Sequence, residues 1–206
     1  MAQRRHHYER AFEEFVRERR IPYVAVDEAK KALVGDASGT RLSRGDPGLR
    51  SLKSFDFVIY GGDTNLLLEL KGRRVRAPKT RRVRFNEDGM LCVPAAKTRL
   101  DSWVTLEDIE ALREWERLFG AGFMAAFAFV YWCDEQPPDS LFTEVFEHHG
   151  RWYAMRVALV EEYARVMKTR STRWGTVHVP GPVFETISTS FGTPGWSAAG
   201  GGAART

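Results

Sequence analysis

The sequence of 206 residues predicts an α/β fold of the α+β kind, in which helices lie on the faces of a mixed sheet. Three observations predict it. Two apolar runs, 55–60 and 65–71, are joined by a Gly-Gly-Asp-Thr turn, which favours an antiparallel hairpin. An amphipathic helix precedes this hairpin. A second helix follows it and leads into the apolar run 123–132, as expected for a crossover back into the sheet.

The N-terminal segment 5–20 is predicted to be a helix because its apolar residues recur at helical spacing. On a helical wheel, Glu9 falls at the edge of the apolar stripe, Glu13 lies further round and Glu14 faces away. Pro22 ends the segment, and 23–27 is expected to be the first strand. The stripe consists of Tyr8, Phe12, Phe15 and Val16.

Charged residues stand at the ends of the two hairpin strands, where an unpaired buried charge is costly. If the loop is symmetric about Gly62 and Asp63, Asp56 lies opposite Glu69. Directly opposed residues share a face, with Cβ atoms about 5 Å apart. Lys71 follows Glu69 by two positions and therefore shares that face as well. A register slip of one residue would break this arrangement.

The later elements follow from turn and cap signals. Thr105 and Asp108 resemble a capping box with Asp in the place of Glu, and the helix that they open ends before Gly120. The run 123–132 is almost wholly apolar, which predicts a strand covered on both faces. Further expected elements are a hairpin of 80–85 and 90–93, a hairpin of 142–147 and 152–157, and a helix over about 158–167.

Composition favours one domain in 1–192, with its core in about 5–133, an elaboration in 134–192 and a disordered tail in 193–206. No apolar run reaches the roughly 18 residues that span a membrane. The start of the chain lacks the apolar segment of a signal peptide. Cys92 and Cys133 are expected to be buried free thiols, and the five histidines show no zinc spacing. A cytoplasmic protein without a membrane partner is expected.

Positive charge is concentrated directly after Glu69. Eight of the fourteen residues from Lys71 to Arg84 are Lys or Arg, and no acid interrupts them. Such a run attracts phosphate backbones, although basic residues also protect solvated sheet edges. Its position beside the acidic residues favours nucleic acid as the partner. The residues expected to contact it are Arg73, Arg74, Arg76, Lys79, Arg81, Arg82 and Arg84.

Two carboxylates and a lysine on one sheet face suit metal-dependent cleavage of a phosphodiester. Asp56 and Glu69 repel each other unless a hard cation such as Mg²⁺ lies between them. A bound cation lowers the pKa of its water and offsets charge in the transition state. Lys71 would position or help to deprotonate the attacking water, or stabilise the phosphorus centre. The alternative is that Glu69 and Lys71 form an ordinary surface pair of little energetic value.

With these residues the chain resembles the PD-(D/E)xK nuclease superfamily, the restriction-endonuclease-like fold, over about residues 5–133. Asp56 and the Glu69-Leu70-Lys71 triplet match its motif, and Glu9 matches its helical acid. Residues 7–13 also match the HYExAFE motif of a largely uncharacterised family. The resemblance implies an αβββαβ core, Mg²⁺ or Mn²⁺ held by Glu9, Asp56 and Glu69, and hydrolysis of DNA. It is compatible with a homodimer, but the sequence defines no interface.

Three functions are therefore weighed. The first is a Mg²⁺-dependent DNA endonuclease or exonuclease with Glu9, Asp56, Glu69 and Lys71 as its catalytic residues. The second is a catalytically inactive module that binds nucleic acid through the basic run. The third is a structural or interaction protein in which the acids and Lys71 form a buried ion network.

Overall fold

The computed structural model describes residues 6–26, 52–62, 64–75, 84–85, 91–92, 100–134 and 145–189. The expected core order αβββαβ is present as α1 (His6–Glu18), β1 (Tyr23–Ala25), β2 (Phe57–Ile59), β3 (Asn65–Val75), α3 (Leu106–Phe119) and β7 (Phe123–Cys133). Between β3 and α3 lie β4 (Arg84–Phe85), β5 (Leu91–Cys92) and β6 (Val104–Thr105). After β7 come β8 (Val145–His148), β9 (Arg151–Leu159), α4 (Val160–Val166), β10 (Lys168–Ser171), β11 (Thr176–His178), α5 (Gly181–Ile187) and β12 (Ser188–Thr189).

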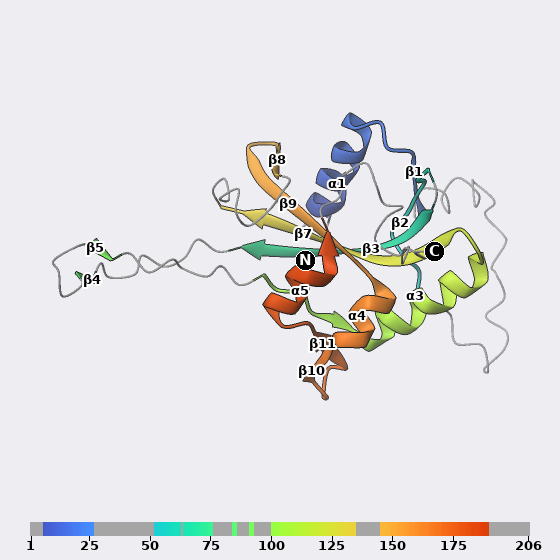
Figure 1. The fold of residues 1–206 in the computed structure, drawn as a ribbon. Helices are drawn as coiled ribbons and strands as arrows, with labels where there is room; N and C mark the ends of the chain where they lie inside the picture. The colour runs from blue at the N-terminus through green and yellow to red at the C-terminus, as the bar shows by residue number, and fades with distance from the viewer. Residues whose placement is uncertain are drawn as a thin grey trace, which may run out of the picture.

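A mixed sheet forms the centre of the molecule, in the strand order β1-β2-β3-β7-β9-β12, with β8 paired to β9. Only β3 and β7 are parallel among these pairs, and α3 is the crossover between them. Helix α1 covers one face of the sheet, whereas α3, α4 and α5 cover the other (Figure 1). The fold is therefore a mixed α/β sheet with helices on both faces, as the sequence predicts.

Each face of the sheet carries its own apolar core. In β7, Phe127 and Phe129 pack with the helices α3 to α5, while Ala126 and Ala128 pack with α1. All four side chains are fully buried. The prediction that this run is covered on both faces is confirmed. Cys133, at the end of the same strand, is buried with a free thiol, also as expected.

The hairpin register is the one expected from the symmetric loop. Phe57 pairs with Leu68 and Ile59 with Leu66, so the next position places Asp56 across from Glu69. The backbone N–H of Asp56 donates to the Leu68 carbonyl at 3.0 Å, which continues the ladder by one residue. This register aligns the acidic ends of β2 and β3 on the sheet face that α3 covers.

Helix α1 forms because its apolar stripe packs on the sheet: Phe12, Phe15 and Val16 are fully buried. The helix ends at Glu18, ahead of Pro22. Glu14 is exposed, as the wheel predicts. Its carboxylate also contacts His148, because the β8–β9 hairpin lies beside this helix.

Helix α3 begins and ends as its cap residues predict. The Thr105 hydroxyl accepts from the Asp108 N–H at 3.1 Å, and the Asp108 carboxylate accepts from the Thr105 N–H at 3.0 Å. Gly120 closes the helix with a φ of 76°, which suits glycine. Strand β6, which leads directly into α3, pairs with β11 in the short sheet β10-β11-β6. The strands of this sheet were not predicted from the sequence.

Two expectations fall partly or wholly outside the described residues. The predicted hairpin around residues 86–89 is seen only as the pairing of Arg84 with Cys92 and of Phe85 with Leu91. The predicted tail 193–206 lies outside them entirely. The predicted hairpin over His149 and Gly150 is confirmed as β8 and β9. No described helix has the length and apolar character that crossing a membrane requires.

Candidate functional site

A cavity of about 410 Å³ lies where β3 meets the N-terminus of α3. The four predicted site residues, Glu9, Asp56, Glu69 and Lys71, all line it. Asp56 and Glu69 come from the hairpin, while Glu9 comes from α1 on the other face of the sheet. Glu9 reaches the cavity near the point where β2 begins, and its charge acts on Asp56. The structure therefore brings together the residues that the sequence singled out.

Asp56 is the most perturbed acid of this site. Its Oδ2 accepts a hydrogen bond from the Leu70 N–H at 2.7 Å. Burial, together with the charges of Glu69 and Glu9, raises the pKa of Asp56 to about 7 against the opposing effects of the Leu70 N–H and Lys71. A carboxylate with such surroundings is poorly neutralised by the protein and would bind a cation or a proton.

Lys71 lies between two carboxylates. Its Nζ is 2.8 Å from Glu69 Oε1 and 2.8 Å from Asp108 Oδ2. Burial nevertheless raises the pKa of Glu69, which Lys71 partly offsets. The Lys71 side chain is thus held as a hydrogen-bond donor and a positive charge inside the cavity.

Sequence reasoning placed Asp108 only in the helix cap and missed its part in the cavity. The carboxylate accepts from the Thr105 N–H, from Lys71 and from Lys53. Lys71, Lys53 and the backbone bond hold the pKa of Asp108 well below its usual range, despite its burial. All of these partners stabilise the charged form. Asp108 is therefore a counter-ion for two lysines and is poorly placed to become a metal ligand.

Lys53 is the second residue that the sequence did not reveal. Trp115 fixes the backbone there, because its indole Nε1 donates to the Lys53 carbonyl at 2.8 Å. The Trp115 ring also packs edge-on against Phe55, with ring centroids 5.4 Å apart. Trp115 itself does not line the cavity. It supports the site from the core.

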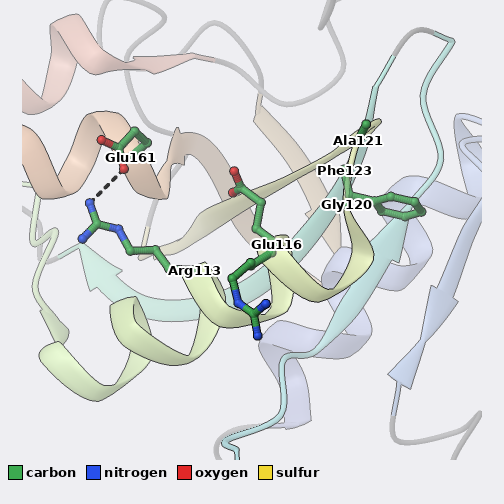
Figure 2. A pocket seen from close by; sticks show the side chains of 7 residues that line it. Arg113, Glu116, Gly120, Ala121, Phe123 and Glu161 are labelled. Atoms are coloured by element: carbon green, nitrogen blue, oxygen red, sulfur yellow. Dashed lines mark hydrogen bonds and ion pairs between the residues drawn. The ribbon is translucent and has the colours of Figure 1, made fainter.

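Glu116, the residue after Trp115 on α3, lies in a different cavity of about 360 Å³ (Figure 2). Its Oε2 accepts from the Ala125 N–H at 2.7 Å and so fixes the start of β7. In the same cavity, Arg113 pairs with Glu161 at 2.8 Å and joins α3 to α4 (Figure 2). These contacts are structural, and they lie apart from the residues around Asp56.

The first two arginines of the basic run lie on opposite faces of β3. Arg73 lines the cavity, donates to the carbonyls of Gly72 (2.8 Å) and Trp103, and lies over the Trp103 ring. Burial lowers the pKa of Arg73. Arg74 is exposed and pairs with Asp134 at 2.8 Å. Arg76, Lys79, Arg81 and Arg82 lie outside the described residues, and Arg84 is described only as part of β4.

Tyr8 and Gly72 join α1 to the strand that carries the site. A Cβ on Gly72 would lie 2.3 Å from the Tyr8 ring, closer than real contacts allow. The ring therefore packs directly on the Gly72 backbone. This close approach sets the position of α1 one residue before Glu9. The motif residue Tyr8 is thus a packing residue at the wall of the cavity.

The donor set suits a hard divalent cation, because Glu9, Asp56 and Glu69 offer only oxygen. Their ligand atoms do not all lie within 4.8 Å of one another, and Glu69 is turned toward Lys71. One ion held by all three would require side-chain rotation. The charge balance favours a cation, since the cavity wall has four carboxylates, two lysines and Arg73. The residues therefore fit Mg²⁺ in chemistry and charge.

Comparisons with known proteins show a resemblance in shape only. No protein-family model and no curated protein matches the chain, so membership of the HYExAFE family stays a prediction from the motif. Among solved structures, the chain is similar to Hjc, a Holliday junction resolvase of Archaeoglobus fulgidus. The TM-score is 0.46, the identity is 13%, and the match covers 89% of this chain and 93% of that one. A superposition at this level does not transfer a function.

Proposed function

We propose that this protein is a divalent-metal-dependent nuclease that hydrolyses phosphodiester bonds of DNA, with Mg²⁺ as the cation and Mn²⁺ as its substitute. The observation that carries the proposal is the state of Asp56. Its carboxylate is directed into a cavity that it shares with Glu69 and Glu9, and its pKa is raised to about 7. No lysine or arginine of the described residues forms an ion pair with it.

The cavity offers each group that the reaction requires. Hydrolysis joins a water oxygen to phosphorus and breaks the bond from phosphorus to a sugar oxygen. A cation held by the carboxylates would acidify the water and offset charge in the transition state. Asp56 and Glu69 supply oxygen ligands from the hairpin, and Glu9 supplies one from α1. Lys71 donates hydrogen bonds to the attacking water or to a phosphate oxygen. Solvent accepts the proton of the water and protonates the leaving oxygen.

A chain of aromatic and basic side chains leads outward from this cavity. Trp103 lines it, and the guanidinium groups of Arg73 and Arg170 lie 4.2 and 5.0 Å from the centre of the Trp103 ring. Arg170 belongs to β10, whose turn carries Trp174 with 70% of its surface exposed. Exposed aromatic rings stack on bases, and arginines bind phosphates. The β10–β11 hairpin therefore supports DNA as the substrate.

The direct test incubates the purified protein with plasmid, single-stranded and branched DNA, with Mg²⁺, with Mn²⁺ and with EDTA. Wild type should cut only with metal, and Asp56→Asn and Lys71→Ala should abolish cutting. Glu110→Gln is the matched control, because Glu110 is an exposed acid of α3 outside the cavity. Its activity should equal that of wild type. Activity that survives both site substitutions would refute the assignment.

A second candidate function is favoured by the ion pairs of Lys71. Because Lys71 bridges Glu69 and Asp108, the cluster can also be a structural network in a protein that binds DNA without cutting it. Removing one member of a buried pair costs about 3–5 kcal/mol. Salt-dependent DNA binding that is indifferent to EDTA and to Asp56→Asn, together with no cleavage, would favour this candidate.

A further inference from the structure

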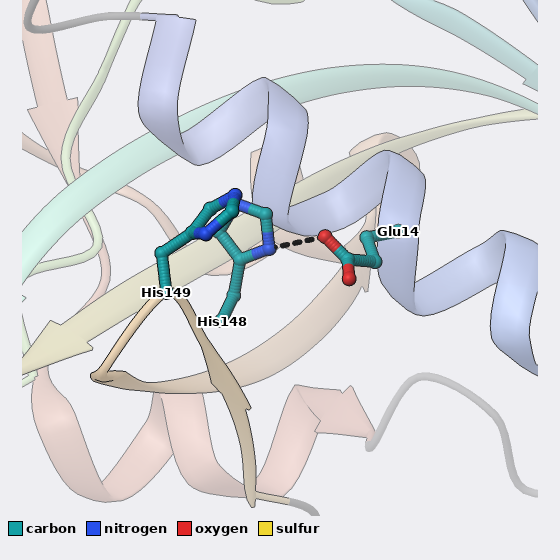
Figure 3. Close-up of side chains that lie close together, drawn as sticks. All are labelled: Glu14, His148 and His149. Carbon is teal, nitrogen blue, oxygen red and sulfur yellow. Dashed lines mark ion pairs between the residues drawn. The ribbon is translucent and has the colours of Figure 1, made fainter.

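A second group of metal-ligating side chains joins α1 to the β8–β9 hairpin. Glu14, His148 and His149 each offer one ligand atom, and these atoms all lie within 4.8 Å of one another. Figure 3 shows the two imidazole rings side by side next to the helix, with the Glu14 carboxylate facing the ring of His148. The group shares no residue with the cavity around Asp56.

The side chains of His148 and His149 lie on the same side because the hairpin turn begins between them. Consecutive residues of a strand point to opposite faces. His149 has left the strand, however, and has a φ of 50°, followed by Gly150 at 71°. Positive φ at both central residues is the pattern of a two-residue hairpin turn, where asparagine is the usual first residue. The turn brings the two ring centroids to 4.2 Å, which two histidines in an extended strand would not reach.

The Nδ1 atom of His148 is the strongest sign of a ligand. The side chain is only 8% exposed, and Nδ1 lies 2.5 Å from Glu14 Oε2. Despite this proximity, no hydrogen bond of acceptable geometry reaches that atom within the described residues. Buried polar atoms nearly always have a partner. A buried imidazole nitrogen that lies close to a carboxylate but has no well-formed hydrogen bond to it is an arrangement that a bridging ion would complete.

Two imidazoles and one carboxylate select the class of metal. This set suits Zn²⁺, which takes three protein ligands and leaves a fourth position to water. Mg²⁺ prefers oxygen ligands. Ligands at about 2.1 Å in tetrahedral geometry lie about 3.4 Å apart, so Nδ1 and Oε2 must separate slightly. Glu14 is 49% exposed and has room to rotate.

The other groups around the cluster are already engaged. Arg151 pairs with His148 across the hairpin, but its guanidinium lies over the Trp132 ring, 5.1 Å from the ring centre. The Nδ1 atom of His7 lies 2.9 Å from the Tyr153 hydroxyl oxygen. Arg151 and His7 are therefore occupied elsewhere, and the ligand atoms of the cluster come from Glu14, His148 and His149. The spacing of the histidines along the sequence did not reveal this set, because its members come from residue 14 and from residues 148–149.

We propose that Glu14, His148 and His149 form a binding site for a transition-metal dication of the zinc class. The site joins the middle of α1 to the β8–β9 turn. Because α1 also carries Glu9, zinc would hold that helix against the sheet. This proposal does not rest on the nuclease assignment and stands without it.

The test is zinc binding by the metal-free full chain, measured by equilibrium dialysis with metal analysis. It should be run in the Asp56→Asn background, so that the carboxylate cavity does not contribute. One zinc ion should bind and should raise the melting temperature, whereas Mg²⁺ should do neither. Co²⁺ in place of Zn²⁺ should give the visible absorption of a tetrahedral site. His149→Ala and Glu14→Gln alter exposed side chains, and each should weaken binding at least about tenfold.

Matched controls come from the same residue types. His178 lies in another cavity, and Glu18 is exposed one turn beyond Glu14 on α1. His178→Ala and Glu18→Gln should bind zinc as the parent does. Zinc affinity unchanged by His149→Ala and by Glu14→Gln would overturn the proposal, as would a parent protein that binds no zinc. Nuclease activity takes no part in these readouts, so the two proposals fail separately.

Discussion

Replacing Asp56 by Asn should stabilise the metal-free protein at alkaline pH. The folded state raises the pKa of Asp56 from 3.8 to about 7. Between these values the folded chain keeps a proton that the unfolded chain has released, so stability falls as pH rises through this range. Asn carries no charge, and its side-chain oxygen can still accept from the Leu70 N–H, which bonds Asp56 at 2.7 Å.

The size of this stabilisation follows from the shift in the pKa of Asp56. A difference of about three pKa units corresponds to about 4 kcal/mol at pH 8, which is an upper limit because Asp56 titrates together with Glu69. About half of that, or 2 kcal/mol, is expected for Asn, because its amide is also desolvated. For a chain of this length, 2 kcal/mol corresponds to a rise of about 4–8 °C in melting temperature. Near pH 4 this advantage should be lost, because the carboxyl of Asp56 is then neutral in the folded wild type as well.

Thermal unfolding in EDTA at pH 4, 6 and 8 measures this difference directly. Adding Mg²⁺ at pH 8 should then stabilise wild type and leave Asp56→Asn unchanged, because the cation replaces the missing counter-charge. Glu110→Gln is the control that changes one acid on the surface of α3. If Asp56→Asn destabilises the protein equally at all three pH values, Asp56 is a satisfied structural acid and the reasoning is refuted.

Three further substitutions test the packing and the substrate path. Gly72→Ala should cost about 1–3 kcal/mol in urea unfolding, because its Cβ meets the Tyr8 ring, whereas Gly62→Ala, with open space, should be nearly neutral. Asp108→Ala should cost about 3–5 kcal/mol, because it leaves two lysines without their counter-ion and removes a helix cap; an unchanged denaturation midpoint would contradict this network. Trp174→Ala should weaken single-stranded DNA binding by about 1–3 kcal/mol without changing the melting temperature, and equal affinity would remove the β10–β11 hairpin from the DNA path.

The convergence of the acids could be predicted because it depends on local rules. The symmetry of the loop sequence about Gly62 and Asp63 predicts the hairpin register, and register alone decides that Asp56 opposes Glu69. The 3.6-residue period of α1 likewise places Glu9, and not Glu13 or Glu14, toward the site. Each inference needs only a short stretch of chain, and in each the apolar residues determine which way the charged ones point.

The partners that the sequence did not reveal depend on contacts between distant segments. Lys53 and Asp108 are 55 positions apart, and the helical period of α3 does not say which strand its first turn will face. The capping box with Thr105 already explains an acid at position 108, so the local sequence pattern contained no sign of a second role for Asp108. The contact of Glu14 with His148 could not be predicted for the same reason, because His148 lies on a hairpin that the helix itself cannot predict.

The structural contacts of Lys71 and its proposed catalytic role are compatible if Asp108 is its permanent partner. Asp108 is bound by Lys53, Lys71 and the Thr105 N–H, which keeps it charged and fixed. Among the described residues, Glu69 pairs with Lys71 alone, at 2.8 Å, and burial raises the pKa of Glu69. A cation beside Asp56 would therefore attract Glu69 away from Lys71, while Asp108 would retain the ammonium. The Asp108 anchor thus lets one carboxylate move to a metal without leaving Lys71 as an unpaired buried charge.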